Sequence, residues 1–213
     1  MESVLAMSET FRYKAVIYDC DGVMFNSLEA NCRFYEAVFN HMEVSLDRSD
    51  ENVMRIIHTY ANRDVLKHFF PEKERLKAAE HFTSSINYLE LIHLMKIESG
   101  LMNTLEQLKG KLHLAVCTNR STSMNAVLAR FNLTDYFSYV MTAARASFPK
   151  PHPDPLLRIL THYGIKAEEA LFIGDSTVDS EAAGAAGVPF VGYRADLDGI
   201  GRIDKHEDII AML

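Results

Sequence analysis

The chain is short of basic residues. Its 22 lysines and arginines are outnumbered by 29 aspartates and glutamates, which gives a formal net charge of −7. Non-specific binding of nucleic acid needs a basic surface, so this charge argues against a nucleic-acid partner. An anionic ligand is not attracted by the chain as a whole either. Any anion site must therefore be built locally.

Cysteine and long apolar segments are also scarce. Cys20, Cys32 and Cys117 form neither an even disulfide set nor a C-x-x-C metal pattern. We therefore expect buried, reduced thiols in a cytoplasmic protein. No segment approaches about 18 uninterrupted apolar residues, and the first residues carry no long apolar region with a basic flank. We expect neither a signal peptide nor a membrane span, and hence no membrane partner.

The remaining composition suits a globular protein, since 48% of the 213 residues are apolar. Short runs typical of β-strands alternate with segments of helical spacing in the second half, which indicates an α/β fold built on a doubly wound parallel sheet. The expected strands have the sequences YKAVIYD, LHLAVCT, YFSYVMT, ALFIGD and PFVGY.

Capping residues mark the expected helices of the second half. Asp154 followed by Pro155 resembles an N-cap with a proline in the first turn, and Gly164 suits the position after the helix. A second helix is expected through 182–186, where small residues favour close packing before Gly187.

The first half departs from this regular alternation. Roughly 90 residues separate the first expected strand from the second, whereas a single crossover needs about 30 to 40. Apolar residues recur at three- and four-residue steps within this segment. We therefore predict an inserted all-helical subdomain, with short hinges near 24–27 and 98–100 and helices over about 28–42, 53–60 and 71–97.

Polar residues follow several of the predicted strands. In open parallel sheets, ligands bind beyond the carboxyl ends of the strands, so these residues are the first candidates for a site. A lysine between prolines, in the sequence FPKPHPDP, precedes the Asp154 helix. The strand-end residues are DCD at 19–21, TNR at 118–120, and GD at 174–175 with Asp179 four residues on.

Together these residue types predict a site for phosphoryl transfer. Mg²⁺ favours hard oxygen ligands and is usually held by one or two carboxylates with the phosphate of the substrate. Asp19 and Asp175 would supply them, with Lys150 as a further positive charge. A weakly basic carboxylate suffices as a nucleophile once the anionic repulsion is neutralised.

In this order, DCDGV, TN, a lysine followed by proline, and GDSTVD resemble the four motifs of the haloacid dehalogenase (HAD) superfamily. The resemblance spans the chain from about Tyr13 to Tyr193, and the insertion is similar to the helical cap of the phosphoglycolate phosphatase-like and phosphoglucomutase-like branch. It implies a Rossmann-like core over residues 1–25 and 99–213, with a cap over 26–98.

The resemblance also implies a role for each motif residue. Asp19 would be the nucleophile that becomes an aspartyl-phosphate, and Asp21 the general acid and base. Asp19, Asp175 and the backbone carbonyl of Asp21 would bind Mg²⁺. The phosphate would be bound by Thr118, Asn119 and Lys150. Asp179 would support the metal ligands without binding the ion itself; the alternative is that it caps the first turn of the helix that follows.

The implied function is a Mg²⁺-dependent phosphatase acting on a small phosphorylated metabolite. A phosphomutase is the main alternative, because retention of the phosphate depends on how the cap excludes water. A receiver-type signalling domain also uses a strand-end aspartate, but needs neither the insertion nor a second acidic pair. A phosphate-dependent binding module is a further alternative. The sequence specifies neither the substrate nor the number of subunits.

Some positions depart from the usual family pattern. Asn26 stands where many relatives have aspartate, and no glycine precedes Lys150. The segment before LEQLK lacks the Pro-Gly turn that is often found there. None of these departures touches a catalytic position. In the cap, the polar residues considered for substrate contact are His58, Tyr60, Asn62 and Arg63.

Overall fold

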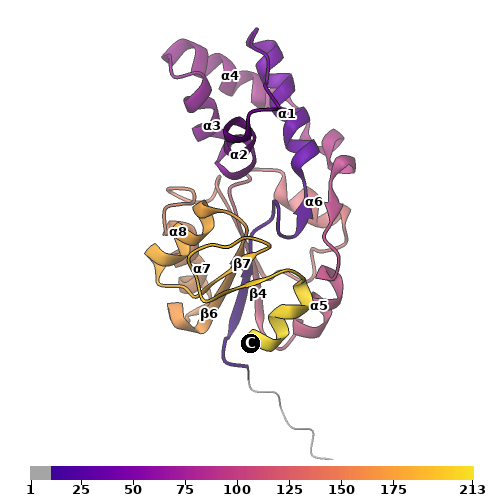
Figure 1. Cartoon of the computed structure of the whole chain (residues 1–213), viewed down its shortest axis with the longest axis vertical. Coiled ribbons are helices and arrows are strands. Elements are labelled where there is room, and N and C mark those ends of the chain that lie inside the picture. The colour runs from indigo at the N-terminus through magenta and orange to yellow at the C-terminus, as the bar shows by residue number, and fades with distance from the viewer. Residues whose placement is uncertain (1–10) are drawn as a thin grey trace, which may run out of the picture.

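A parallel six-stranded sheet forms the centre of the larger part of the molecule (Figure 1). The computed structural model describes residues 11–213. The strand order is β5-β4-β1-β6-β7-β8, and every pairing along it is parallel. The strands are β1 (Ala15–Tyr18), β4 (His113–Thr118), β5 (Tyr139–Thr142), β6 (Ala170–Gly174), β7 (Phe190–Tyr193) and β8 (Gly201–Ile203). The predicted doubly wound α/β fold is confirmed.

The central strand β1 is buried along its whole length, as its continuous apolar sequence requires in a sheet covered on both faces. Its side chains alternate between two apolar clusters. Val16 and Tyr18 join the cluster on one face, and Ala15 and Ile17 join the cluster on the other. This period of two follows from the pleat of a strand.

Helices cover both faces of the sheet. One face packs against α5 (Leu101–Leu108), α6 (Met124–Arg130) and η3 (His206–Met212). The other packs against α7 (Asp154–Tyr163) and α8 (Thr177–Ala186), with the short η2 (Ala167–Glu169) between α7 and β6. The three cysteines are free and buried, as expected.

The ends of α7 confirm one capping prediction and correct another. Gly164 follows the helix in the left-handed conformation, with φ 63°, where glycine has no steric penalty. Asp154, predicted as the N-cap, is instead the first helical residue, because Pro153 already has helical dihedral angles. The Asp154 carboxylate accepts hydrogen bonds from the Ser147 backbone at 2.8 Å and from Arg158 at 3.0 Å. It therefore ties the helix start to the preceding loop.

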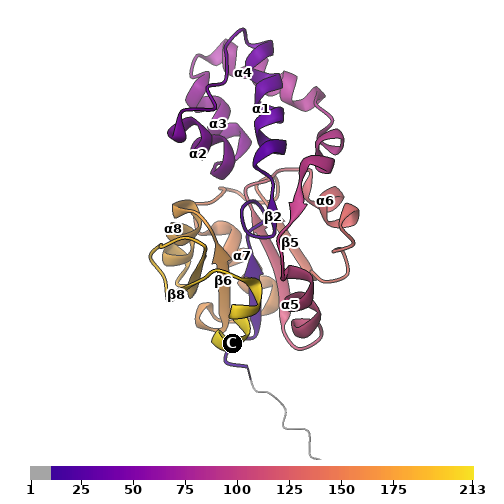
Figure 2. The same cartoon turned by 45° about the vertical axis from the view of Figure 1, so that its right-hand side comes forward.

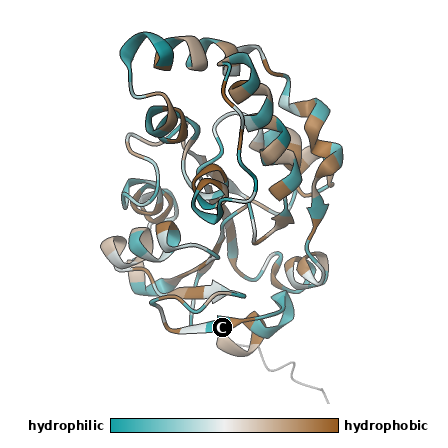
Figure 3. Ribbon diagram, turned by 45° about the horizontal axis from the view of Figure 1, so that its top comes forward, coloured by the Kyte–Doolittle hydropathy of each residue, from teal (hydrophilic) through white to brown (hydrophobic). Residues whose placement is uncertain are grey.

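The insertion forms a second group of helices above the sheet (Figure 1). Brown and teal segments alternate along these helices in Figure 3, as expected of elements with one buried face. The first four of them share their own apolar cluster, which includes Val38, Phe39, Ile57 and Leu66, whereas Ile92 of the last one joins a cluster of the sheet. The elements are α1 (Leu28–His41), α2 (Glu51–Thr59), α3 (Asn62–Phe69), α4 (Lys73–Ser85) and η1 (Tyr88–Leu94). None of the helices within 11–213 is long and apolar enough to cross a bilayer.

The helix predicted from about Pro71 to Ile97 is wrong in its extent. Within that range α4 ends at Ser85, and the Ser85 hydroxyl donates to the Phe82 carbonyl at 2.7 Å. Asn87 then caps η1 by accepting from the backbone of Leu89 at 3.2 Å. Short polar side chains that bond to nearby backbone compete with helix continuation, so the apolar periodicity overestimated the length. The separate helix α3 was not predicted.

Two short strands join the two parts of the molecule. The strands β2 (Phe25–Asn26) and β3 (Lys96–Ile97) pair antiparallel. The segment that enters the helical insertion and the segment that leaves it therefore run side by side (Figure 2). The predicted hinges lie at or next to this pair. The division into 1–25, 26–98 and 99–213 stays a prediction.

The strand order reverses at β1. The chain proceeds from β1 through β4 to β5 on one side, and then returns to β6 and continues outward to β8 on the other. Such a switch point leaves a crevice beyond the carboxyl ends of the central strands, where open α/β sheets bind ligands. The helical insertion lies over this end of the sheet (Figure 1).

Candidate active site

The strand-end residues predicted from the sequence come together because their strands are neighbours. β1 lies between β4 and β6, so Asp19, Thr118 and Asp175 emerge at the same edge. The backbone N–H of Asp19 donates to the Ile173 carbonyl at 2.9 Å, which extends the β1–β6 pairing to the nucleophile candidate itself. The position of Asp19 is therefore fixed by the sheet.

Lys150 is buried next to Asp19, with 2% of its surface exposed. Its ammonium group donates to Asp19 at 2.8 Å, to Asp179 at 2.6 Å and to the Cys117 carbonyl at 2.9 Å. All three ammonium hydrogens thus have acceptors. The two carboxylates offset the cost of burial and raise the pKa of Lys150, so the lysine stays charged.

Asn119 holds the lysine loop in place. Its side-chain oxygen accepts from the Lys150 N–H at 3.0 Å, and its amide donates to the Lys150 carbonyl at 3.0 Å. The same amide donates to the Thr59 carbonyl of the helical insertion at 3.0 Å. Because an amide has two hydrogens, these contacts use both of them. Asn119 therefore positions Lys150 and links the two parts of the molecule.

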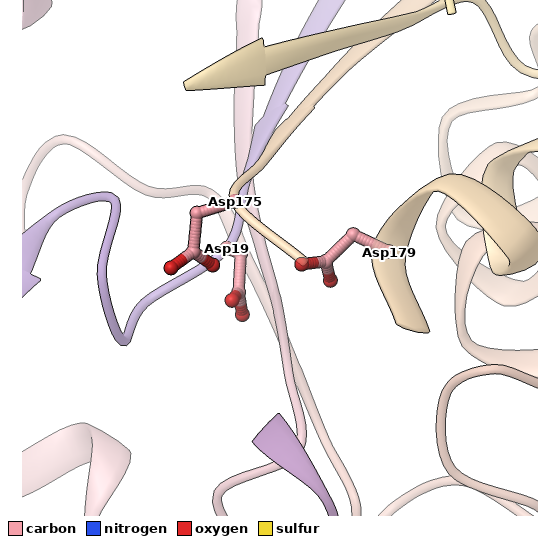
Figure 4. A group of neighbouring side chains, drawn as sticks. All are labelled: Asp19, Asp175 and Asp179. Atoms are coloured by element: carbon pink, nitrogen blue, oxygen red, sulfur yellow. The ribbon is translucent and has the colours of Figure 1, made fainter. Parts of the chain in front are cut away.

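Asp19, Asp175 and Asp179 form an acidic cluster at the end of the sheet (Figure 4). One carboxylate oxygen from each lies within 4.8 Å of the others. Burial raises the pKa of Asp19 to about 7 despite the opposing effect of Lys150. Burial, followed by the charges of Asp179 and Asp19, raises the pKa of Asp175. Closely spaced, desolvated oxygen donors of this kind fit a hard divalent cation, which would relieve their repulsion.

Two glycines allow this cluster to form. A Cβ atom on Gly22, which has φ 77°, would collide with the Asp175 carboxylate. A Cβ atom on Gly174 would lie 2.5 Å from the Asp179 Cβ. The absence of a side chain thus lets Asp175 approach the turn after β1 at Gly22, and lets Asp179 approach the end of β6 at Gly174.

Asp179 caps the helix that follows it, which is one of the two roles expected for it, and it also pairs with Lys150. One carboxylate oxygen accepts from the Ser176 N–H at 3.2 Å and the Ser176 hydroxyl at 2.5 Å, forming a capping box at the start of α8. The other oxygen is the one paired with Lys150. The helix start and the buried lysine are thus connected through one side chain.

Asp21 forms a bidentate ion pair with Arg120, a strand-end residue for which the sequence predicted no role. Arg120 donates through Nε to one oxygen at 2.8 Å and through Nη2 to the other at 2.6 Å. The Ser27 hydroxyl also donates to Asp21. Burial acts to raise the pKa of Asp21, but the Arg120 charge and hydrogen bonds outweigh it and lower that pKa. Asp21 is therefore ionised at neutral pH.

Arg120 also reaches into the helical insertion. Its guanidinium donates to the Tyr88 hydroxyl at 2.8 Å and to Asn31 at 3.3 Å, and it lies 4.7 Å from the centre of the Tyr88 ring. The Tyr88 hydroxyl in turn donates to Asn31 at 3.0 Å. The only sequence signal for this network was the position of Arg120 directly after Thr118 and Asn119. Its partners Asn31 and Tyr88 were missed because they are far away in the sequence.

A cavity of about 290 Å³ lies between the insertion and the end of the sheet. Asp19, Asp21, Thr118, Asn119 and Lys150 line its lower wall. Of the four cap residues considered from the sequence, three line the cavity, namely His58, Tyr60 and Asn62. Arg63 does not, since its side chain is 81% exposed and pairs with Glu80.

A profile of the haloacid dehalogenase-like hydrolase family matches residues 16–193, which is most of the chain. The chain belongs to this family. The match agrees with the motif resemblance and argues against the receiver-type alternative.

Individual relatives of this HAD hydrolase support the same fold. A HAD-superfamily hydrolase of subfamily IA from Geobacter sulfurreducens PCA is 53% identical, with a TM-score of 0.77 covering 97% of this chain and 99% of that one. A putative phosphoglycolate phosphatase from Lactobacillus plantarum has a TM-score of 0.82 at 20% identity, covering 94% and 99% of the two chains. At that identity the likeness concerns the fold alone.

A curated relative matches over a shorter length. The phosphoglycolate phosphatase of Escherichia coli (strain K12) is 42% identical over 92 residues, which is 42% of this chain and 36% of that protein. The chain thus matches about a third of the length of this curated relative.

The buried pair at the cavity of this HAD hydrolase generates a stability prediction. Arg120→Met leaves the Asp21 carboxylate buried without its cation, so we expect the free energy of unfolding to fall by about 3–5 kcal/mol. Adding Asp21→Asn removes the orphaned charge, and the double variant should lose less than the sum of the two single variants. Urea unfolding curves measure all three.

Arg33→Met is the matched control. The Arg33 side chain is 58% exposed and pairs with surface glutamates, so its loss should cost less than about 1 kcal/mol. Strict additivity of Arg120→Met and Asp21→Asn would show that the two side chains do not stabilise each other.

Proposed function

We propose that the chain is a Mg²⁺-dependent phosphatase that hydrolyses a small phosphorylated metabolite through an aspartyl-phosphate on Asp19. The observation that carries this proposal is the placement of Asp19. It lies in the wall of the cavity, bonded to the Lys150 ammonium and next to two further carboxylates. A carboxylate so placed has a route to a ligand, and cations beside it can offset the repulsion of an approaching phosphate.

The acidic cluster would hold the metal ion. Asp19 and Asp175 would contribute carboxylate oxygens, and the Asp21 backbone carbonyl would contribute a third ligand. Bound Mg²⁺ would neutralise negative charge on the phosphoryl group and on the cluster. Asp179 lies within the same cluster, but its two oxygens already serve Lys150 and the start of α8. Its proposed role is to hold the lysine in position.

Thr118 and Lys150 would bind the phosphate oxygens. The Thr118 hydroxyl oxygen accepts from the Arg120 backbone N–H at 3.1 Å, which leaves its hydrogen to donate into the cavity. Lys150 offsets the charge of Asp19 and of the phosphoryl group together. The Asn119 side chain has used both amide hydrogens, so we propose that it supports phosphate binding by fixing Lys150.

Asp21 would act as the general acid and base. As the ionised partner of Arg120 it is ready to take a proton from the water that hydrolyses the phosphoenzyme. Donation of a proton to the leaving group requires that Asp21 first acquires one. In the arrangement described, Arg120 occupies both of its oxygens. The acid step therefore needs this ion pair to loosen when a substrate fills the cavity.

The test of the nucleophile is Asp19→Asn. The amide preserves the shape of the side chain but cannot attack phosphorus, so phosphate release from an aryl phosphate in Mg²⁺ should fall by roughly 10³-fold or more. Asp196→Asn, at a side chain that is 85% exposed, should retain wild-type activity. Thermal unfolding of both variants checks that the fold persists. Substantial Mg²⁺-dependent turnover by Asp19→Asn would refute the assignment.

The test of Asp21 depends on the leaving group. Asp21→Asn should impair hydrolysis of an alkyl phosphate far more than that of an aryl phosphate, whose leaving oxygen needs little protonation. General acid catalysis contributes about 10²- to 10⁴-fold. The ratio of the two rates is the readout, because it does not change with the fraction of folded protein. An equal loss on both substrates, with no phosphoenzyme accumulating, would limit Asp21 to its structural role in the turn.

The metal proposal predicts a pH dependence of Mg²⁺ affinity. Because the pKa of Asp19 is raised to about 7, the metal-free carboxyl holds a proton below that pH, and Mg²⁺ must displace it. Affinity should therefore fall as the pH is lowered from 8 to 6, by up to about tenfold per pH unit for each proton displaced. Calorimetry in buffers of different ionisation enthalpy measures both the affinity and the released protons. A constant affinity over this range would contradict the prediction.

A further inference from the structure

The upper part of the cavity has aromatic walls. Phe34, Tyr35, Tyr60 and Tyr88, all from the helical insertion, line it. Their rings supply apolar faces, and the tyrosines add hydroxyl groups that can exchange hydrogen bonds with a ligand. Such walls suit a ligand with both carbon-bound hydrogen and hydroxyl groups.

The other groups that the insertion contributes to this wall include neutral polar side chains. Asn62, Thr83 and Ser84 offer amide or hydroxyl groups. His58 is the one titratable nitrogen base among the described cap residues that line the cavity. Burial lowers the pKa of His58, and its Nδ1 lies 3.1 Å from the Asn31 amide. The imidazole is therefore neutral at neutral pH and accepts from that amide.

Both cations that line the cavity within residues 11–213 are already compensated. The Arg120 guanidinium is bidentate to Asp21, and the Lys150 ammonium bonds two carboxylates. When the phosphate of a substrate lies beside Asp19, Lys150 must also offset the negative charge of that phosphate. A second anionic group on the substrate would therefore enter the cavity without a cation to meet it.

We propose that the cavity selects phosphate monoesters whose leaving group is neutral and carries hydroxyls, and discriminates against esters with a second anionic group. This inference rests on the proposed phosphatase function and deepens it. Desolvating an uncompensated carboxylate in the cavity is costly, and the Asp21 carboxylate would repel it further. Neutral hydroxyls, by contrast, find donors and acceptors along the wall.

The experiment compares substrates that differ only in one group. 2-Hydroxyethyl phosphate and 2-phosphoglycolate form one pair, and glycerol 3-phosphate and 3-phosphoglycerate form a larger one. In each pair a hydroxymethyl group replaces a carboxylate. We expect kcat/KM to favour the neutral member by at least about tenfold. An aryl phosphate, assayed in parallel with Mg²⁺, reports whether the phosphatase activity itself is present.

Two neighbouring serines provide matched variants. Both lie in the last turn of α4 and bond backbone carbonyls of their own helix, but Ser84 lines the cavity and Ser85 does not. Ser84→Lys should raise the relative kcat/KM for the carboxylated substrates by about tenfold, because it supplies the missing cation. Ser85→Lys adds the same charge outside the cavity and should leave the ratio unchanged.

The outcomes separate the inference from the function on which it rests. Equal or better hydrolysis of the carboxylated members by the wild type overturns the charge selection, while the phosphatase proposal stands. An equal shift in both serine variants shows a general effect of charge and overturns the role of the cavity. No hydrolysis of any ester, the aryl phosphate included, refutes the proposed function itself.

Discussion

The buried ammonium group of Lys150 is the contact on which the geometry of the site depends. It joins the end of β1, through Asp19, to the start of α8, through Asp179. Without the lysine, three carboxylates would lie within 4.8 Å of one another in a desolvated space with no positive charge among them. Without the carboxylates, the lysine could not remain charged inside the protein. The strand end, the helix start and the lysine loop are therefore held in position together.

A second buried cation connects the helical insertion to the sheet. Arg120 pairs with Asp21 below and contacts Asn31 and Tyr88 above. The ion pair of Asp21 is thus linked to the position of the insertion, because Asp21, Asn31 and Tyr88 all accept from the same guanidinium nitrogen. A displacement of Asn31 or Tyr88 would therefore change the hydrogen bonds of the guanidinium that pairs with Asp21.

Much of the fold was predictable because apolar periodicity records burial directly. Five of the six strands in the sheet coincide with the expected apolar runs, and the helices α1, α2, α7 and α8 lie where helices were expected. The errors have local causes. β8 spans only Gly201–Ile203 and has no apolar run of its own. The helix expected through Ile97 ends early because polar side chains after Phe82 bond to the backbone. Periodicity reports which residues are buried, but not where competing hydrogen bonds interrupt a helix.

The sequence by itself determined which chemical groups are present and in what order, since DCD, TN, the lysine before proline and GDSTVD fix the motifs and the family. Parallel neighbouring strands then made it predictable that these groups meet at one edge of the sheet. Only the tertiary structure decided which side chain neutralises which. Asn119 turned out to support Lys150, and Arg120 to bind Asp21 across 99 positions of the chain. Pairing of charges depends on distance and burial in space, and separation along the sequence specifies neither.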